Sequence, residues 1–445
     1  MNNLEIFRYI TNVNPVSLKY LNSIDIGGDI EIFLEKNGIP ESSMNYFTST
    51  LIDGQGIYER DGFPIEVKPF YGTCLETRAN NIQELLRKIY EICIKNSLSL
   101  SSKSKIIVDL DKIKESGDKE SLILGCSPDI NIYNSSINKK KSGEELAVRT
   151  AGGHVHLSIK EYDWKSLIKK QAFSINGNKI NVILPSENGE KIIKNIIKWM
   201  DLMAGILSVL LDEKTGRREI YGKAGDIRVK EYGIEYRALS NFWIIHPVYF
   251  WIILSSCRLA MYLRDEEIPD NLNFDNIRNI IDTEDKEGAL DIFIKNLYMI
   301  YDISNKYSLN VYYWKKSYIE YLICFVVAHY VNFNKCREIF SDNIFENWGI
   351  LDKKKFRNSR FKDWACKHYG DNNYVVISYC LHGLNGHGLN MKIYNSFNDE
   401  EKILYNEIVN RAIKAFIEYS GNKLSKDFNI GDNFGFPYDD EVYTK

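Results

Sequence analysis

Alternation of apolar and polar residues predicts strands in the first half of the chain. Within residues 24–34, Ile30 and Ile32 alternate with Asp29 and Glu31. Successive side chains of a strand point to opposite faces, so the apolar pair and the acidic pair lie on different faces. Three further segments alternate in the same way: 63–70, 151–160 and 231–239. We therefore expect four strands, each with one apolar and one polar face.

Helical spacing of apolar residues predicts helices in other parts of the chain. The expected helical segments are 80–96, 190–211, 247–265, most of 285–346, and 397–419. Residues 97–105 and 134–145 are polar and of low complexity, so we expect exposed loops there. Residues 371–395 combine a possible strand with a glycine- and asparagine-rich loop. That loop contains His382 and His387, and a plain turn is favoured over a substrate loop.

The longest apolar stretch, residues 241–263, raises the question of a membrane span. His246, Pro247 and Arg258 interrupt it, together with two serines. A spanning helix needs about 20 predominantly apolar residues with few or no charges. Proline is favoured in the first turn of a helix. We therefore predict a buried helix that begins near Pro247.

Composition and charge narrow the class of protein. The 445 residues are 44% hydrophobic, with 28 glycines and 9 prolines, which excludes a collagen-like or mostly disordered chain. With 57 basic and 60 acidic residues the net charge is −3, so we expect neither nucleic acid nor an anionic membrane as a partner. The eight cysteines form no C-x-x-C pair, and the first residues lack a secretory signal pattern. A cytoplasmic protein is the expectation.

The polar faces of the four predicted strands carry the residues that could perform chemistry. They are Asp29 and Glu31, Glu66, His154 and His156, and Glu235 and Arg237. Each set alone is weak, because D-x-E is common on the solvent face of an antiparallel sheet. Together they concentrate carboxylates, imidazoles and a guanidinium, where an ordinary solvated face would carry lysine, threonine and serine.

Carboxylates gathered on one sheet face repel each other unless a cation is present. Carboxylates with imidazoles suit Mg²⁺ or Mn²⁺, and could also hold Zn²⁺. The arginines then need an anionic partner, because guanidinium groups bind phosphate and carboxylate bidentately. This combination indicates phosphoryl transfer from a nucleotide. The sequence contains neither a P-loop nor a GxGxxG motif after a strand, so metals and arginines would hold the nucleotide.

Plainer interpretations stay open for the same residues. Glu235 and Arg237 could be a surface ion pair, which would contribute little. His154 and His156 could be ordinary core or surface histidines. Considered alone, the histidines would also suit a Zn²⁺ hydrolase, but that function leaves the arginines without a purpose.

Five sequence blocks occur in an order that is similar to one enzyme family. They are IGGDIEIF (26–33), ERDGFPIEVKP (59–69), GCSPDINIY (125–133), RTAGGHVHLS (149–158) and YGKAGDIRVKEYGIEYRALSNFW (221–243). Together they resemble the phage-type carboxylate–amine ligases, the amidoligase branch of the glutamine synthetase superfamily. The resemblance covers about residues 24–265, and GGHVH and the last block are its most specific parts.

The resemblance implies two divalent metal sites that hold Mg²⁺ or Mn²⁺. The implied metal ligands are Asp29, Glu31, Glu66, His154, Glu235 and either Glu59 or Asp61. Asp29 stands where glutamine synthetase itself has a glutamate. His156 is implied to contact substrate or to support a ligand.

The resemblance also implies ATP as the nucleotide and assigns cationic residues to it. Arg218, Lys223 and Arg228 would clamp the nucleotide phosphates and the acyl phosphate, with Arg217 as the alternative to Arg218. Arg237 would contact phosphate or the substrate carboxylate.

The implied fold is α+β, a glutamine-synthetase-like curved and mainly antiparallel sheet. Its concave face would hold the site and its convex side would carry helices. Residues 24–265 would form this catalytic core, and 266–430 a mainly helical region that packs on the core or closes over the site. Residues 431–445 would be an acidic and aromatic tail.

The implied activity is ATP-dependent ligation of a carboxylate to an amine through an acyl phosphate. Both substrates would be small molecules or peptides. A phosphotransferase on the same scaffold would stop at the phosphorylated product, and a catalytically inactive homologue would only bind ligands.

Overall fold

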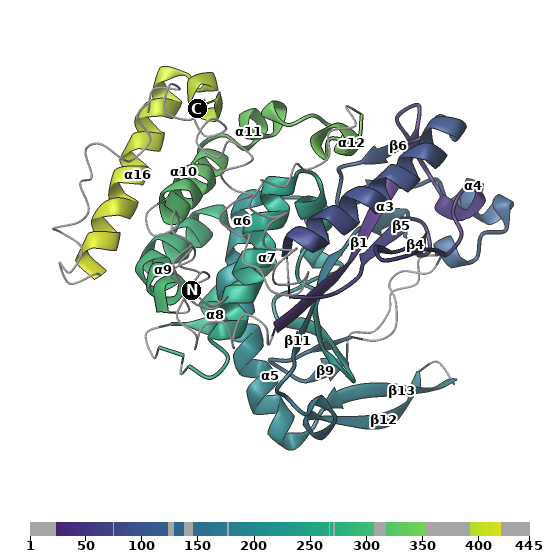
Figure 1. The fold of residues 1–445 in the computed structure, drawn as a ribbon, viewed down its shortest axis with the longest axis horizontal. Coiled ribbons are helices and arrows are strands. Elements are labelled where there is room, and N and C mark those ends of the chain that lie inside the picture. Colours follow the sequence, from purple (N-terminus) through teal and green to yellow (C-terminus); the bar gives the residue numbers. More distant parts are fainter. Residues whose placement is uncertain are drawn as a thin grey trace, which may run out of the picture.

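A computed structural model describes most of the chain in atomic detail. The described residues are 24–73, 75–122, 129–137, 146–175, 178–266, 268–269, 272–306, 317–351 and 392–419. They form an α+β fold in which a large antiparallel sheet lies beside a group of helices (Figure 1).

The main sheet contains the four strands that alternation predicts. Its strands are β1 (Ile24–Lys36), β2 (Ile39–Glu41), β3 (Thr50–Ile52), β4 (Gly56–Arg60), β5 (Ile65–Pro69), β6 (Ser99–Ser101), β8 (Ile130–Asn131), β9 (Ser136–Ile137), β11 (Gly153–Ile159), β14 (Asp226–Lys230) and β15 (Gly233–Tyr236). Their order is β3-β4-β5-β1-β11-β15-β14-β8-β9, with β2 and β6 also paired to β1. The four predicted strands β5, β1, β11 and β15 are therefore consecutive neighbours, and the prediction is confirmed.

Two small sheets accompany the main one. One pairs β7 (Lys105–Ile107) with β10 (Val148–Thr150), and the other is the hairpin of β12 (Ile168–Ile175) and β13 (Asn178–Pro185). The prediction of an exposed loop over 97–105 is wrong, because this segment contains β6 and the start of β7. Leu100 and Ser101 of β6 are buried against β1. Serine-rich composition suggested a loop, whereas pairing with a neighbouring strand decides the structure. Residues 138–145 of the second predicted loop lie outside the described residues.

The helices of the described residues occur in every predicted helical segment and also at 110–116 and 274–283, where none was predicted. They are α3 (Leu75–Asn96), α4 (Leu110–Ser116), α5 (Glu187–Met200), α6 (Ile206–Leu211), α7 (Pro247–Tyr262), α8 (Phe274–Thr283), α9 (Lys286–Lys306), α10 (Ser317–Val331), α11 (Phe333–Ile339), α12 (Ile344–Asn347) and α16 (Asp399–Tyr419). A π-helical segment, η4 (Asp201–Gly205), joins α5 to α6, and short 3₁₀ turns include η5 (Arg217–Glu219) and η6 (Asn241–Ile244). His382, His387 and the tail 431–445 lie outside the described residues.

Helix α7 begins at Pro247 as predicted. His246 precedes it, and its side chain accepts a hydrogen bond from the Val248 amide at 3.1 Å. None of the helices in the described ranges has the length and hydrophobicity that a membrane crossing requires.

The apolar face of the main sheet packs against helices, and this leaves the other face for chemistry. Helices α3 and α7 contact β5 and β1, and Ile30 and Ile32 of β1 are fully buried. Figure 1 shows α3 crossing beside β1 and β5, with α9, α10 and α16 farther away on the other side of α7. Burial of this continuous apolar face is the main favourable contribution to folding. The polar residues of the same strands therefore lie on the opposite face.

Gly153, the first residue of β11, tests how tightly the core constrains the site strands. A Cβ atom there would lie 2.3 Å from Trp243 Nε1 and 2.4 Å from the Ser240 carbonyl oxygen. We expect Gly153→Ala to lower the free energy of unfolding by about 1–3 kcal/mol, because backbone and a packed indole must move. Gly27→Ala is the control, since a Cβ atom at Gly27 would come no closer than 3.2 Å to its nearest neighbour, Tyr71 Cβ. Urea unfolding measures both, and equal losses would contradict this account.

Candidate active site

Cross-strand register brings the predicted site residues onto one face of the main sheet. Glu31 of β1 lies opposite Glu66 of β5. On its other side β1 pairs with β11, where Asp29 lies opposite His154, and β15 extends the row with Glu235. Residues that pair directly across strands share a face and lie close enough for their side chains to interact. The four strands thus form one continuous polar surface.

Three carboxylates at the β5 side of this surface form what we call the acidic group: Glu31, Asp61 and Glu66. One oxygen from each lies within 4.8 Å of the others. Glu31 is only 8% exposed and accepts a hydrogen bond from the Gly152 amide at 2.6 Å. Burial, and then the charge of Asp61, raises the pKa of Glu31 to about 7, and burial beside other carboxylates raises the pKa of Glu66. This oxygen set suits Mg²⁺ or Mn²⁺.

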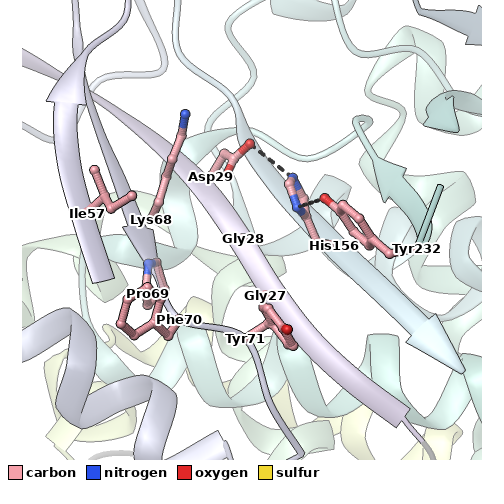
Figure 2. A pocket seen from close by; sticks show the side chains of 10 residues that line it. All are labelled: Gly27, Gly28, Asp29, Ile57, Lys68, Pro69, Phe70, Tyr71, His156 and Tyr232. Carbon is pink, nitrogen blue, oxygen red and sulfur yellow. Dashed lines mark hydrogen bonds and ion pairs between the residues drawn. The ribbon is translucent and has the colours of Figure 1, made fainter. Parts of the chain in front are cut away.

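A second group lies beside it, and we call Asp29, His156 and Glu235 the mixed group. Their possible ligand atoms also lie within 4.8 Å of one another. His156 Nε2 lies 3.0 Å from Asp29 Oδ2 and 3.7 Å from Glu235 Oε2. The Tyr232 hydroxyl lies 2.9 Å from His156 Nδ1 and orients the ring (Figure 2). Two carboxylates with one imidazole are a reasonable donor set for a divalent cation.

Glu235 is fully buried and lies between several positive groups. Arg237 forms a short ion pair with Glu235 Oε1. Arg228 Nη1 and Lys230 Nζ each lie 3.2 Å from Oε2, and His154 Nδ1 lies 3.4 Å from Oε1. A buried carboxylate needs such compensation, because the loss of hydration costs several kcal/mol. The interpretation of Glu235 and Arg237 as an exposed surface pair is wrong, because both are buried.

The structure groups His156, rather than His154, with the other candidate metal ligands. His154 is buried, and its Nε2 lies 3.2 Å from the Tyr221 hydroxyl. Burial, and then the charge of Arg237, lowers the pKa of His154 well below its usual range, so the ring is neutral. A neutral ring between Glu235 and Tyr221 supports the groups around it.

Of the two alternatives for a further carboxylate, the structure brings Asp61 and not Glu59 into the acidic group. Glu59 instead accepts from Ser49 at 2.9 Å and pairs with Lys68 at 2.5 Å. Lys68 also forms a short ion pair with Glu66. This lysine is a built-in counter-ion at the edge of the acidic group.

Two arginines, Arg217 and Arg237, lie close to the ring of Tyr221 on one side of the site. The guanidinium groups of Arg237 and Arg217 each lie 5.2 Å from the centre of its ring. Arg237 is further fixed by Asp129, whose Oδ2 lies 3.0 Å from Nε, and by a short contact with the Tyr221 hydroxyl. This side of the site is therefore rich in positive charge.

Arg217 and Arg218 differ sharply in their surroundings. Arg218 donates to Ser208 Oγ at 2.7 Å and lies 3.5 Å from Glu284, so structural partners engage it. Arg217 is 2% exposed, donates to the Leu239 carbonyl at 3.1 Å, and has no ion-pair partner within the described ranges. Its charge nevertheless lowers the pKa of both Glu31 and His154, which places it beside the site.

Lys223 stands apart from the other predicted cations. Its side chain is exposed, and its charge partly offsets the rise that burial causes in the pKa of Asp282, which belongs to neither group. Its backbone amide donates to Asp226 Oδ2 at 2.8 Å, which fixes the turn before β14. Arg228, by contrast, contacts Glu235 within the site.

An open pocket of about 300 Å³ borders the mixed group (Figure 2). Its lining residues are Gly27, Gly28, Asp29, Ile57, Lys68, Pro69, Phe70, Tyr71, His156 and Tyr232. Gly27 lies opposite His156 and has no side chain to fill this space. Asp29, Lys68 and His156 make one part of the wall charged or polar, and the aromatic rings of Phe70, Tyr71 and Tyr232 make the rest flat and apolar.

Several residues of the site are absent from the sequence-based set. Lys68 follows Glu66 by two residues, and Lys230 follows Arg228 by two, so strand periodicity could have found both. Tyr221, Tyr232 and Asp129 lie outside the strands, and no spacing rule points to them.

Comparison with known proteins supports the family that the motifs indicate. A family described as "Phage phiEco32-like COOH.NH2 ligase-type 2" matches residues 189–280. Over these residues the chain is similar to the phage-type carboxylate–amine ligases, the family that its motifs resemble. No curated protein matches the sequence. The family's description is that of a ligase.

The ligase match covers one side of the site. Residues 189–280 include η5, β14 and β15, and hence the arginines and Glu235. Strands β1, β5 and β11, which carry Asp29, Glu31, Glu66 and the two histidines, lie outside the matched range. Their assignment to the site rests on the register of the sheet and on the two groups that this register creates.

Glu31 provides a test of the acidic group through pH. Because its folded-state pKa is raised to about 7, the folded protein holds this proton more tightly than the unfolded chain. The protonated carboxyl of Glu31 therefore contributes to the stability of the folded protein at low pH, and this contribution is lost as the pH rises to about 7. In EDTA, we expect Glu31→Gln to gain stability relative to wild type from about pH 5 to about pH 8.

Thermal or urea unfolding across this range measures the difference, with the exposed Glu91→Gln as a control. Added Mn²⁺ should reverse the order, because wild type gains more from the cation than the glutamine variant. A constant difference at all pH values would contradict the acidic group.

Proposed function

We propose that the protein is an ATP-dependent carboxylate–amine ligase that forms an amide through an acyl phosphate, on a glutamine-synthetase-like sheet. The observation that carries this proposal is the adjacency of the acidic and mixed groups, with buried arginines facing them from the matched family region. A substrate that brings together divalent cations and a polyphosphate is complementary to this arrangement.

The donor atoms fit two Mg²⁺ or Mn²⁺ ions. The acidic group offers three carboxylates, and the mixed group offers two carboxylates and an imidazole. The raised pKa values of Glu31 and Glu66 reflect carboxylates that are buried together without sufficient positive charge. When bound, the ions would supply positive charge that offsets the negative charge developing on the phosphate during transfer.

The other interactions with the nucleotide and the substrate carboxylate would come from arginine side chains of the protein. Arg217, Arg228 and Arg237 would bind oxygens of the nucleotide and of the substrate carboxylate, which suits their planar forked geometry. The substrate carboxylate attacks the γ-phosphorus, ADP leaves, and the amine then displaces phosphate from the acyl phosphate to leave an amide. Burial of Arg217 and Arg237 favours exclusion of water, which would otherwise hydrolyse the intermediate.

The pocket beside the mixed group is suited to the nucleotide. The aromatic rings of Tyr71 and Tyr232 could stack on a base. Lys68, and Asp29 and His156 of the mixed group, line the same pocket and would lie next to the phosphates of a nucleotide bound there. Lys223 and Arg218, which the family resemblance implies as phosphate clamps, would then contribute less than Arg217.

The substrates and the cellular compartment are part of the same proposal. We propose small-molecule or peptide carboxylates and amines as substrates, and activity in the cytoplasm. The free thiols of Cys93, Cys257, Cys324 and Cys336 are consistent with a reducing compartment.

The acyl phosphate is the decisive intermediate. With ATP, Mg²⁺ and the correct carboxylate, hydroxylamine should trap it as a hydroxamate while ADP accumulates. A panel of amino acids and peptides, scored for hydroxamate and for amine-dependent phosphate release, identifies the carboxylate. ADP formation with a stable phosphorylated product and no hydroxamate would instead support a phosphotransferase, and ATP binding without turnover would support an inactive homologue.

Arg217 and Arg218 form a matched pair for testing the anion site. Arg217→Lys keeps the charge but loses the fork, so we expect about ten- to a hundred-fold lower turnover of ATP. Arg218→Lys should stay within about three-fold of wild type, because Ser208 and Glu284 rather than ligand engage it. Steady-state ADP release with Mg·ATP measures both. A larger loss in the Arg218 variant would overturn the assignment.

A further inference from the structure

Another buried carboxylate lies behind the site, on the apolar side of the sheet. Asp201 is fully buried at the start of the π-helical segment η4. Its Oδ1 accepts from the Tyr236 hydroxyl at 2.6 Å and from the Gly225 amide at 3.4 Å, and its Oδ2 accepts from the Tyr133 hydroxyl at 2.7 Å. Asp201 has no ion-pair partner in the described part of the chain. Neutral donors alone therefore compensate this buried charge.

The three donors come from three segments that each deliver residues to the site. Tyr236 is the β15 residue between Glu235 and Arg237, and points to the opposite face. Gly225 directly precedes β14, which carries Arg228 and Lys230. Tyr133 follows β8 and is four residues after Asp129, the partner of Arg237. A single carboxylate thus fastens the strands that bear the cationic side of the site.

Two glycines leave the space that these contacts need. A Cβ at Gly205 would lie 2.9 Å from the Tyr236 hydroxyl, and a Cβ at Gly225 would lie 2.3 Å from the Tyr133 ring. Gly225 also has a φ of +78°, which favours glycine. The π-helical turn that carries Asp201 is a rare geometry that is frequent near functional sites. Each of these features accommodates the same cluster.

We propose that Asp201 is a positioning residue that holds Glu235 and Arg237 in their binding geometry by fixing Tyr236 from behind the sheet. The importance of this role for catalysis rests on the proposed function. The effect of Asp201 on the geometry of Glu235 and Arg237 does not depend on that function. Because side chains alternate along β15, rotation of Tyr236 away from Asp201 would turn Glu235 and Arg237 together in the opposite sense. The mixed group, which contains Glu235, would lose its geometry first.

The test compares four variants at about pH 8. Burial raises the pKa of Asp201 to about 7, and the carboxylate is ionised at this higher pH. Asp201→Ala leaves two buried hydroxyls without an acceptor, and Tyr236→Phe removes one hydroxyl. Asp201→Asn keeps an acceptor oxygen and should partly rescue. Tyr249→Phe is the matched control, since it deletes a buried hydroxyl that lies 2.8 Å from His329, in the helical part of the fold.

Two readouts need no catalysis. Hydrogen exchange of peptides that cover residues 233–240 should speed up by about ten-fold or more in Asp201→Ala and Tyr236→Phe, and not in Tyr249→Phe. Affinity for Mn²⁺ alone should fall by about ten-fold in the same two variants, with Asp201→Asn between them and wild type.

The outcomes separate this proposal from the proposed function. Local exchange and Mn²⁺ affinity that match the Tyr249→Phe control would overturn the positioning role, even in an active ligase. Equal loss across all four variants would also overturn it, because this indicates a merely structural role. Altered exchange and metal affinity in a protein without ligase activity would support the positioning role and count against the proposed function. A fifth variant, Gly205→Ala, keeps Asp201 but would place its Cβ 2.9 Å from the Tyr236 hydroxyl, and it should reproduce the exchange change.

Discussion

The buried carboxylate of Glu235 is the constraint on which the site depends. It lies on the second strand of a β11–β15–β14 row and is fully enclosed. A charge in that position is tolerable only when Arg228, Lys230 and Arg237 approach it together. Arg228 and Lys230 lie on β14 and Arg237 directly follows β15, so the relative register of these two strands must be fixed. Compensation of one charge and alignment of the polar face of the sheet are the same structural requirement.

Much of this arrangement follows from alternation along the strands. The period of two places Asp29 with Glu31 and Glu235 with Arg237, and the structure keeps each pair on one face. Neighbouring positions in the sheet also follow once the apolar faces are buried, because a slip by one residue would bury the acidic residues instead. The four central strands and the start of α7 at Pro247 could thus be predicted from residue pattern alone.

Alternation does not decide which residue of a shared face reaches which partner. His154 and His156 point the same way, yet His156 leans toward Asp29 because Gly27 opposite it leaves space. A Cβ at Gly152 would lie 2.2 Å from His154 Nε2, so that glycine makes room for the second ring. Arg217 and Arg218 lie in a 3₁₀ turn, where no period separates inward from outward positions. Their difference depends on Ser208 and Glu284, which are remote in sequence.

The site is electrically polarised, and this limits what it can bind. Carboxylates dominate at β5 and β1, with Lys68 as their internal counter-ion. Arginines and Lys230 dominate at β14, β15 and η5, with Glu235 and Asp129 as theirs. The acidic side would repel an anion that binds alone, and the basic side would repel a cation that binds alone. A ligand that carries a cation and an anion together satisfies both sides at once, so the two ions should each strengthen the binding of the other. A metal–polyphosphate complex has this polarity, whereas a metal ion with a neutral hydrolytic substrate gives no anionic partner to Arg217, which has no ion pair among the described residues.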